Sequence, residues 1–388
     1  MSINGPENSF NSSIKYLQSK MFQNKDSCQI IGPSNSDRRR RELLKKIQNI
    51  VLQTVNSAAS DCEGPLLRLY SRRCRWQDCN FNQRLSKKPK HEASMQEIRY
   101  TTNKKRFDII FNILAKIYRL LQTKSSLTKR ELYYEQTELF GSQAKVNAAL
   151  LDICGLLGAS PWELRVFSTS KGLVAGDLVI TTADKEVINC SRPRGVLVPQ
   201  NVKEISKIQS SAAFILLVEK DAAFQKLLDD GAHKKFAPCI IITGKGEPDI
   251  NTRLLVHRLC RELSVPVLIV VDADPYGIEI MCTYRFGSLS LSEHSQHLAV
   301  AEVRWVGIHP TDINKFCIPT VPLTPRDFVK ARELSTRPYI CQNQELLEQV
   351  NCLLESGQKC EIENLSALSP TFLTDMFLSY KITSKEVI

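Results

Sequence analysis

The stretch VPVLIVVDADPYGIEIM, residues 265–281, gives the clearest indication of the architecture. Its first part, Val265–Val271, is a nearly continuous run of β-branched and apolar residues, typical of a strand buried on both faces. Upstream, similar runs alternate with segments of helical periodicity. The expected strands are Phe214–Val218 and Cys239–Thr243, and the expected helices are Ala222–Leu228 and Asn251–Leu263. Strands separated by helices predict an α/β domain with a mostly parallel sheet, here within residues 206–388.

Acidic residues directly follow two of these strands. Glu219 comes after Phe214–Val218, and Asp272 and Asp274 come after Val265–Val271. Ligands of open α/β sheets bind beyond the carboxyl ends of the strands, and alternate residues of an extended chain share one side. Three carboxylates converging there favour a divalent cation, and ligands that are all oxygen suit Mg²⁺. The alternative is that strand-end acids only cap the next helix or stabilise a turn.

Residues 103–205 show a second pattern, three helices followed by two short alternating stretches. The helices are expected over Phe107–Leu121, from the capping box Thr128–Glu131 onward, and over residues 143–156. Alternation in Glu163–Ser168 and Leu173–Thr182 predicts a β-hairpin around Lys171 and Gly172. This order predicts a winged-helix domain. That class commonly binds duplex DNA, although the same order occurs in protein-interaction domains.

Two adjacent tyrosines, Tyr133 and Tyr134, lie in the second of these helices. Arg130 precedes Tyr134 by one turn, so the two side chains share a helix face, whereas Tyr133 points about 100° away. A guanidinium at this place favours a phenolate nucleophile and also binds phosphate. The alternative is that the pair packs in a core or an interface, as tyrosine pairs in helices usually do.

Small and basic residues at the expected hairpin are candidates for DNA contact. Lys171, Gly172 and Gly176 would let a phosphate backbone approach closely. Lys245, in the glycine-rich stretch TGKG at 243–246, is assigned to the same DNA-binding set.

Residues 1–102 are rich in Asn, Ser, Gln and Lys, and are expected to be largely flexible. One amphipathic helix is expected near residues 38–57, after a candidate N-cap at Ser36 and Asp37. Its apolar stripe needs a packing partner, which is either a separate protein chain or this chain's own core. The candidate partner-binding residues of the stripe are Leu43, Ile47, Ile50 and Val51.

The net charge of +11 is unevenly spread along the 388 residues. Residues 1–100 carry +9, residues 101–210 carry +6, and residues 211–388 carry −4. A basic front suggests contact with a polyanion, and an acidic back suggests carboxylate chemistry. No apolar run reaches the ~18–20 residues of a membrane span and the N-terminus has no signal-peptide core, so no membrane partner is expected. The 13 cysteines include no C-x-x-C pair, which favours reduced thiols in an intracellular protein.

Six stretches, in this order, resemble one family. They are TKRELYYEQTELFGSQ, FSTSKGLVAGDL, LLVEKDAAFQKLLDD, ITGKGEPDINTRLLVHRL, VPVLIVVDADPYGIEIMCTYRFGS and RWVGIHP. The chain resembles the A-type subunit of type IIB DNA topoisomerases (topoisomerase VI), which is the subunit that cleaves DNA. It resembles more closely the eukaryotic relative of that subunit, the animal-like meiotic double-strand-break transesterase. The resemblance covers about residues 104–340.

The resemblance implies a reaction and its residues. Tyr134 would attack a DNA phosphodiester, giving a 5′-phosphotyrosyl link, with Arg130 beside it. Glu219, Asp272 and Asp274 would be the Mg²⁺ ligands of a toprim domain. These positions all match the family's motif.

The resemblance also implies partners. Double-stranded DNA is the expected substrate, and a homodimer would form composite active sites, each with the tyrosine of one protomer and the metal site of the other. No G-x-x-x-x-G-K-[ST] motif is present, so ATP hydrolysis would belong to a B-type partner subunit. Other meiotic break factors and a nuclear location on chromosomes are expected as well. By its position, the stripe near residues 38–57 is a candidate for docking the B-type subunit.

Three other functions stay open: the cleaving subunit of a type IIB topoisomerase in somatic cells, a toprim nuclease or primase, and a non-catalytic winged-helix DNA-binding protein. Arg130 and Tyr134 argue against a nuclease or primase, whose reactions need no tyrosine. The acidic residues after the strands argue against a simple DNA reader.

Overall fold

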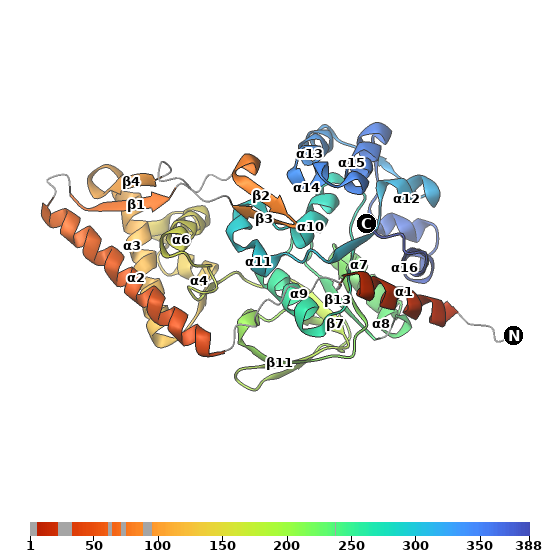
Figure 1. Cartoon of the computed structure of the whole chain (residues 1–388), viewed down its shortest axis with the longest axis horizontal. Helices are drawn as coiled ribbons and strands as arrows, with labels where there is room; N and C mark the ends of the chain where they lie inside the picture. Colours follow the sequence, from red (N-terminus) through yellow and green to blue (C-terminus); the bar gives the residue numbers. More distant parts are fainter. Residues whose placement is uncertain (1–5, 22–32, 61–63, 71–74, 88–94, 237) are drawn as a thin grey trace. The chain divides into compact units, whose positions relative to one another are not determined.

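In the computed structural model, the described residues are 6–21, 33–60, 64–70, 75–87, 95–236 and 238–388. They form two compact units, each assembled from separate parts of the chain (Figure 1). The sheet unit consists of Met1–Lys25, Arg75–Lys87 and Ser170–Ile388. The helical unit consists of Asp26–Cys74 and Lys88–Thr169. The N-terminal third of the chain therefore contributes to both units.

The main sheet of the sheet unit has the strand order β10-β7-β13-β12-β14-β15. Its strands are β7 (Leu173–Gly176), β10 (Val196–Leu197), β12 (Phe214–Val218), β13 (Cys239–Thr243), β14 (Val267–Val270) and β15 (Val303–Gly307). β12 is parallel to β13 and to β14, and β14 is parallel to β15. β7 pairs antiparallel with β13 and with β10. The predicted α/β fold with a mostly parallel sheet is confirmed.

Helices connect the successive parallel strands, as the alternating pattern predicts. They are α7 (Asp221–Asp229), α9 (Ile250–Leu263) and α10 (Pro275–Arg285). α9 begins after Asp249, whose carboxylate accepts a hydrogen bond from the Thr252 backbone N–H at 2.8 Å. This is a standard N-cap, because the side chain satisfies a backbone donor that has no partner within the helix.

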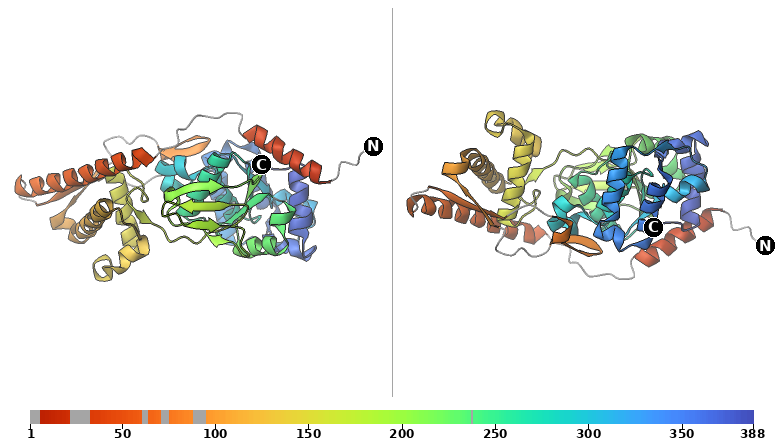
Figure 2. Two further views of the ribbon diagram at one scale, coloured as in Figure 1. Left: turned by 90° about the horizontal axis from the view of Figure 1, so that it is seen from below. Right: turned by 90° about the horizontal axis from the view of Figure 1, so that it is seen from above.

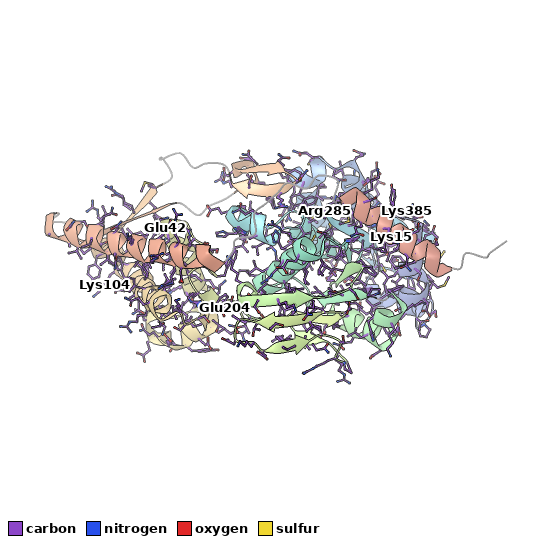
Figure 3. All side chains as sticks on the ribbon, turned by 60° about the horizontal axis from the view of Figure 1, so that its bottom comes forward. Lys15, Glu42, Lys104, Glu204, Arg285 and Lys385 are labelled. Atoms are coloured by element: carbon purple, nitrogen blue, oxygen red, sulfur yellow. The ribbon has the colours of Figure 1, made fainter. Side chains whose placement is uncertain are left out.

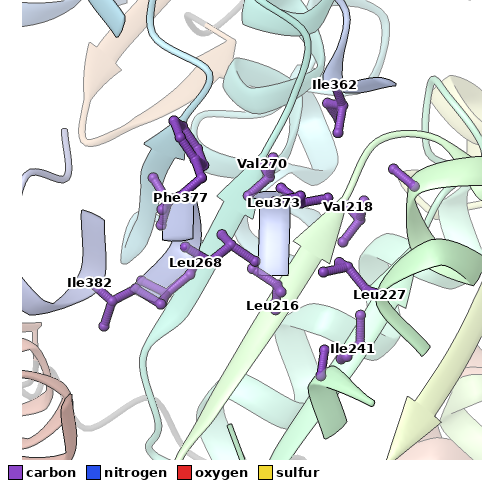
Figure 4. Close-up of a cluster of buried hydrophobic side chains, with 14 of the residues drawn as sticks. Leu216, Val218, Leu227, Ile241, Leu268, Val270, Ile362, Leu373, Phe377 and Ile382 are labelled. Atoms are coloured by element: carbon purple, nitrogen blue, oxygen red, sulfur yellow. The ribbon is translucent and has the colours of Figure 1, made fainter. Parts of the chain in front are cut away.

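One face of the main sheet carries a hydrophobic core (Figure 4). Alternate residues of β12 and β14 contribute to it, as the two-residue period of a strand requires. Its labelled members are Leu216, Val218, Leu227, Ile241, Leu268, Val270, Ile362, Leu373, Phe377 and Ile382. The last four come from residues 360–388, called the C-terminal segment below. This segment also pairs with the chain just after β14, through the bridge between Ala273 and Cys360. The C-terminal segment is therefore brought to the strand ends.

Two pieces of the first hundred residues pack onto the sheet unit. α1 (Pro6–Met21) stacks Phe10 on Phe236, with ring centroids 5.3 Å apart, and contacts α16 (Leu378–Thr383) (Figure 2). Lys385 Nζ lies 4.0 Å from the Tyr16 ring centroid on the same side of the unit (Figure 3). The hairpin of β2 (Cys79–Asn82) and β3 (Arg84–Lys87) sets Phe81 edge-on to Phe286 at 5.3 Å. The prediction of a largely flexible region 1–102 is wrong for these residues, because their aromatic side chains find partners far along the chain.

The helical unit is built on helices with short strand pairs beside them. Its elements are α2 (Pro33–Ser60), α3 (Tyr100–Thr123), α4 (Lys129–Tyr134), α5 (Thr137–Phe140), α6 (Gln143–Leu157), β1 (Leu66–Tyr70), β4 (Met95–Arg99), β5 (Leu127–Thr128) and β6 (Val166–Phe167). The predicted helices over 107–121 and 143–156 are confirmed, and their apolar faces share one core. The amphipathic helix begins at Pro33 rather than after Asp37, so the predicted N-cap is wrong.

The predicted hairpin of the winged-helix domain does not form. β6, the part of 163–168 that is a strand, pairs in parallel with β5 of the helical unit. β7, the start of 173–182, instead joins the main sheet beside β13. The compact helical unit accordingly ends at Thr169 and not near residue 205. Alternation showed that both stretches are strands, but a two-residue period carries no information on which strand is the partner.

The remaining α-helices and strands of the described residues belong to the sheet unit. They are β8 (Val179–Thr182), β9 (Val187–Asn189), β11 (Ile205–Gln209), α8 (Ala232–Lys235), α11 (Ser295–Leu298), α12 (Pro310–Lys315), β16 (Val321–Pro322), α13 (Pro325–Ser335), α14 (Pro338–Cys341), α15 (Gln344–Ser356) and β17 (Gln358–Lys359). Within the described residues, no helix has both the length and the apolar character that crossing a bilayer requires.

Candidate active site

Tyr134 is the last residue of α4, and its side chain is 70% exposed. The helix is fixed at its start by the predicted capping box. Glu131 N–H donates to Thr128 Oγ1 at 3.1 Å, and Thr128 N–H donates to Glu131 Oε2 at 2.6 Å. Tyr134 lines an open hollow of about 480 Å³ whose other lining residues are Ser126, Leu127, Glu131 and Glu135. The phenol is therefore presented to solvent on a locally well-defined helix.

Tyr133 and Arg130, the neighbours of Tyr134, lie on different faces of α4, as the helical wheel predicts. Tyr133 is partly buried and packs against the core of the helical unit. Arg130 is exposed, one turn before Tyr134, and no hydrogen bond joins the two in the part of the chain described. The guanidinium thus stands on the solvent side of α4, where an anionic ligand could meet it.

Glu219 and Asp272 lie at the ends of adjacent parallel strands, β12 and β14. Both side chains are buried, and the Asp272 backbone N–H donates to Glu219 Oε2 at 2.9 Å. Asp272 Oδ1 accepts a hydrogen bond from the Ile362 backbone N–H at 2.8 Å. The strand ends therefore bring these two predicted site residues together.

Asp274 also performs the structural role that was considered as the alternative. It is the N-cap of α10, and its Oδ1 accepts a hydrogen bond from the Gly277 backbone N–H at 2.7 Å. A Cβ on Gly277 would clash with the Asp272 carbonyl oxygen, so only glycine permits this tight turn. This turn keeps Asp272 and Asp274 close to each other.

Burial dominates the electrostatics of the acids. It raises the pKa of Glu219, and the charge of Asp272 raises it further. Burial likewise raises the pKa of Asp272, although hydrogen bonds from Lys220 and Ile362 oppose this effect. The pKa of Asp274 is raised by burial too. Raised pKa values for neighbouring carboxyls are typical of functional sites, where burial and nearby like charges disfavour the ionised form.

Lys220 and two acids of the C-terminal segment complete this site, and the sequence analysis missed them. Lys220 Nζ lies 2.8 Å from Asp272 Oδ2, 2.8 Å from Glu361 Oε2 and 3.0 Å from Glu363 Oε2. Burial alone would lower the pKa of Lys220, but hydrogen bonds to these carboxylates outweigh it and raise the pKa. Lys220 directly follows Glu219 and could have been noticed, whereas no local pattern linked residues 361–363 to the strand ends.

The donor set of Glu219, Asp272 and Asp274 fits Mg²⁺ in its chemistry, since it offers only oxygen atoms and excess negative charge. Its arrangement is not yet that of a metal site. Among the residues described, no three His, Cys, Asp or Glu side chains are placed to enclose an ion. Both Asp272 oxygens and one Asp274 oxygen are held by other groups, so side chains would rearrange on binding.

The predicted DNA-binding residues are only partly available to a ligand. Gly172 and Gly176 are buried, and a Cβ on them would clash with Thr252 Oγ1 and with the Cys239 carbonyl oxygen, respectively. Both glycines serve close packing within the sheet unit, which corrects the assignment. Lys171 is exposed, and its Nζ donates to the Lys245 carbonyl oxygen at 3.1 Å. Lys245 Nζ pairs with Asp221 at 3.0 Å.

The predicted partner-binding stripe divides into two parts. Leu43 and Ile47 are buried in the core of the helical unit, so their assignment to a partner surface is wrong. Ile50 is partly buried against the same core, whereas Val51 is 40% exposed. Leu52 and Val55 are exposed as well. The alternative of packing on the chain's own core thus holds for the first half of the stripe.

Comparison with known proteins gives two matching families. Residues 214–382 match the Toprim domain family of Spo11 and of the A-type subunit of topoisomerase 6. Residues 105–166 match the family described as type IIB DNA topoisomerase. The first segment contains Glu219, Asp272 and Asp274, and the second contains Tyr134.

Individual relatives extend these matches. The chain is 38% identical over 347 residues to human "Meiotic recombination protein SPO11", covering 88% of this chain and 87% of that one. It is 38% identical over 282 residues to Drosophila melanogaster "Meiotic recombination protein W68", covering 71% and 82%. It is also 38% identical over 285 residues to the DNA topoisomerase 6 A3 protein of Oryza sativa subsp. indica, covering 72% and 64%. The chain therefore belongs to the family of Spo11 and the A-type topoisomerase 6 proteins, as its motifs predict.

Proposed function

We propose that this chain is a topoisomerase-like transesterase that makes DNA double-strand breaks in meiosis and so starts homologous recombination. Two of the relatives above are named meiotic recombination proteins. The observation that carries the proposal is Tyr134, an exposed phenol on a capped helix within the segment that matches type IIB topoisomerases. An exposed tyrosine beside an open hollow suits attack on a large substrate.

The proposed reaction is a transesterification. The Tyr134 oxygen forms a bond to a DNA phosphorus, the bond from phosphorus to the 3′-oxygen breaks, and the tyrosine proton ends on that oxygen. The products are a 5′-phosphotyrosyl link and a free 3′-hydroxyl, and no water or nucleotide is consumed. Arg130, exposed one turn before Tyr134, would bind the phosphate through charge-assisted hydrogen bonds.

Glu219, Asp272 and Asp274 would hold Mg²⁺ in this reaction. When bound, Mg²⁺ supplies positive charge that stabilises the phosphate and the leaving oxygen. The chain's own contribution is to hold the acids at the ends of β12 and β14 and to keep them away from bulk water.

The proposal includes a homodimer with composite active sites on double-stranded DNA. Tyr134 belongs to the helical unit and the acids belong to the sheet unit, so each half of the chemistry sits on its own folded part. ATP hydrolysis is assigned to a B-type subunit. The candidate docking surface for it is the second half of α2, where Val51, Leu52 and Val55 are exposed and Ile50 is partly buried beside them. Other meiotic break factors and a nuclear location on chromosomes are part of the same proposal.

A second candidate is the cleaving subunit of a type IIB topoisomerase that relaxes or decatenates DNA in somatic cells. It is favoured by the identity of 38% to the rice protein named for DNA topoisomerase 6. Covalent complexes confined to meiotic germ cells would support the first function. Complexes in dividing somatic cells would support the second.

The test is recovery of DNA that stays attached to the protein after denaturation. Tyr134→Phe should abolish attachment while leaving DNA affinity and the melting temperature unchanged, because only an exposed hydroxyl is lost. Tyr133→Phe is the matched control and should retain attachment, since its ring packs on the core. Attachment that survives Tyr134→Phe and is lost in Tyr133→Phe would refute the assignment.

A further inference from the structure

Lys220 connects a buried acid with two acids at the surface. Its ammonium group is shared among Asp272, Glu361 and Glu363, at distances of 2.8 to 3.0 Å. The Asp272 side chain is 6% exposed, whereas those of Glu361 and Glu363 are 54% and 41% exposed. One flexible side chain therefore spans the boundary between the strand end and solvent.

The acids around Lys220 outnumber the cations that face them. Glu219, Asp272 and Asp274 come from the strand ends, and Glu361 and Glu363 come from the segment after β17. A second cation near these acids is Lys359, whose Nζ is paired with Asp327 at 2.8 Å and which lowers the pKa of Asp274 and Glu361. Within the described residues, the ammonium group paired with Asp272 is that of Lys220.

We propose that Lys220 is the internal counter-ion of the acidic site and exchanges with a divalent cation. Without metal it holds Asp272 Oδ2. When the cation arrives, Lys220 leaves that oxygen and stays on Glu361 and Glu363. This inference rests on the proposed metal site. It adds that the cation displaces Lys220 from Asp272 and that Glu361 and Glu363 then hold the Lys220 ammonium group.

The existing contacts make this exchange a small movement. Lys220 already bonds both surface acids, so it loses one partner and keeps two. An ammonium group on a flexible stem tolerates such a change, because it has no fixed fork geometry to satisfy. Asp272 keeps its hydrogen bond from the Ile362 N–H, so the aspartate stays in place while its outer oxygen changes partner.

The test measures Mn²⁺ binding to the full chain without DNA, using electron paramagnetic resonance of the free ion. Lys220→Met removes the competing ammonium and keeps much of the stem. It should tighten Mn²⁺ binding by about tenfold or more, since a nearby positive charge is lost as well. Lys226→Met in α7 is the matched control. It removes an ion pair with Asp230, at the end of the same helix, and should leave Mn²⁺ affinity unchanged.

A second pair of substitutions tests the receiving acids. Glu361→Gln with Glu363→Gln leaves the ammonium on Asp272 and should weaken Mn²⁺ binding. In the Lys220→Met background the same two substitutions should change Mn²⁺ affinity much less, because no ammonium group remains for Glu361 and Glu363 to bind. A mere loss of negative charge would instead weaken binding equally in both backgrounds, so the cycle separates the two explanations.

Each outcome decides the matter. Tighter binding by Lys220→Met together with the background dependence supports the exchange. Unchanged or weaker binding by Lys220→Met, with a wild type that does bind Mn²⁺, overturns the exchange and leaves the metal site standing. Absence of Mn²⁺ binding in every variant overturns the metal site and the exchange together. If Lys220→Met does not fold, Lys220→Gln takes its place in the same cycle, and unchanged affinity of the glutamine pair in the wild-type background contradicts the proposal.

Discussion

The two units hold their functional residues in opposite ways. In the helical unit, Tyr134 projects from a six-residue helix and is 70% exposed beside an open hollow. In the sheet unit, Glu219 and Asp272 are buried at strand ends and bonded to the backbone and to Lys220. The nucleophile is therefore nearly independent of the fold, whereas the acids are part of it. Substitutions should reveal this difference in stability as well as in activity.

The largest effects are expected at the acids, where activity and stability should separate. Glu219→Gln should abolish DNA cleavage yet raise the metal-free melting temperature by about 2–4 °C, because a neutral amide avoids the cost of burying charge near Asp272. Asp272→Asn should also abolish cleavage, and it should raise the metal-free melting temperature by less than Glu219→Gln does. Burial raises the pKa of Asp272 as well, but hydrogen bonds from Lys220 and Ile362 favour its charged form.

These two variants are measured by thermal melts and by cleavage of supercoiled DNA. Tyr134→Phe is the comparison from the other unit, with no cleavage and an unchanged melt. A Glu219→Gln protein that cleaves normally would contradict the proposed role of this acid. A destabilised Asp272→Asn protein would show that the contact with Lys220 outweighs the cost of burying the Asp272 charge.

The stabilising effect of Glu219→Gln should depend on pH. The folded protein holds the Glu219 proton more tightly than the unfolded chain does, since burial raises the pKa above its ordinary value of 4.5. The cost of ionising Glu219 is therefore absent below that value and grows as pH rises toward the raised pKa. Melts of wild type and variant across this range should diverge with increasing pH, and a constant difference would refute the cause.

A smaller comparison concerns α2 in the helical unit. Leu43 is 1% exposed, so Leu43→Ala should cost about 2–5 kcal/mol of stability. Val51 is 40% exposed, so Val51→Ala should cost less than about 0.5–1 kcal/mol. Chemical denaturation measures both. Val51→Glu should reduce co-purification with a B-type subunit without changing the melting temperature. A destabilised protein with normal partner affinity would contradict the docking proposal.

A further comparison distinguishes packing from DNA contact at Gly172. Gly172→Ala should destabilise the sheet unit by about 1–3 kcal/mol, because its Cβ would meet Thr252 and the Thr243 carbonyl. Gly155→Ala in α6 is the control, since open space surrounds that position and alanine favours a helix. A stable Gly172→Ala protein with weakened DNA binding would restore the original assignment.

Local signals in the sequence predicted the sheet unit well. The apolar runs of β12, β13 and β14 are buried on both faces, and the carboxyl ends of parallel strands meet at one edge. Those two facts were enough to predict that Glu219 and Asp272 lie together. The start of the helix that carries Tyr134 was also predictable, because its capping box is local in the chain. The different environments of Tyr133 and Tyr134 agree with the predicted helix, in which adjacent residues point about 100° apart.

Distant pairing escaped prediction. The partner of β7 is β13, more than sixty residues later, so the expected hairpin was wrong. Phe10 and Phe81 find aromatic partners far along the chain, and Glu361 and Glu363 approach Lys220 from the C-terminal segment. Such contacts depend on tertiary folding, which periodicity within one segment cannot encode.

The proposed function depends above all on a covalent bond between Tyr134 and DNA. Mass spectrometry can locate that bond in peptides, after the denatured protein–DNA complex has been digested with nuclease and protease. We expect a nucleotide remnant, joined through a 5′-phosphate, on the peptide TKRELYYEQTELFGSQ or its fragments, with fragmentation placing it on Tyr134. A remnant on Tyr133 or on another residue, or trapped DNA without any modified tyrosine, would contradict the proposal.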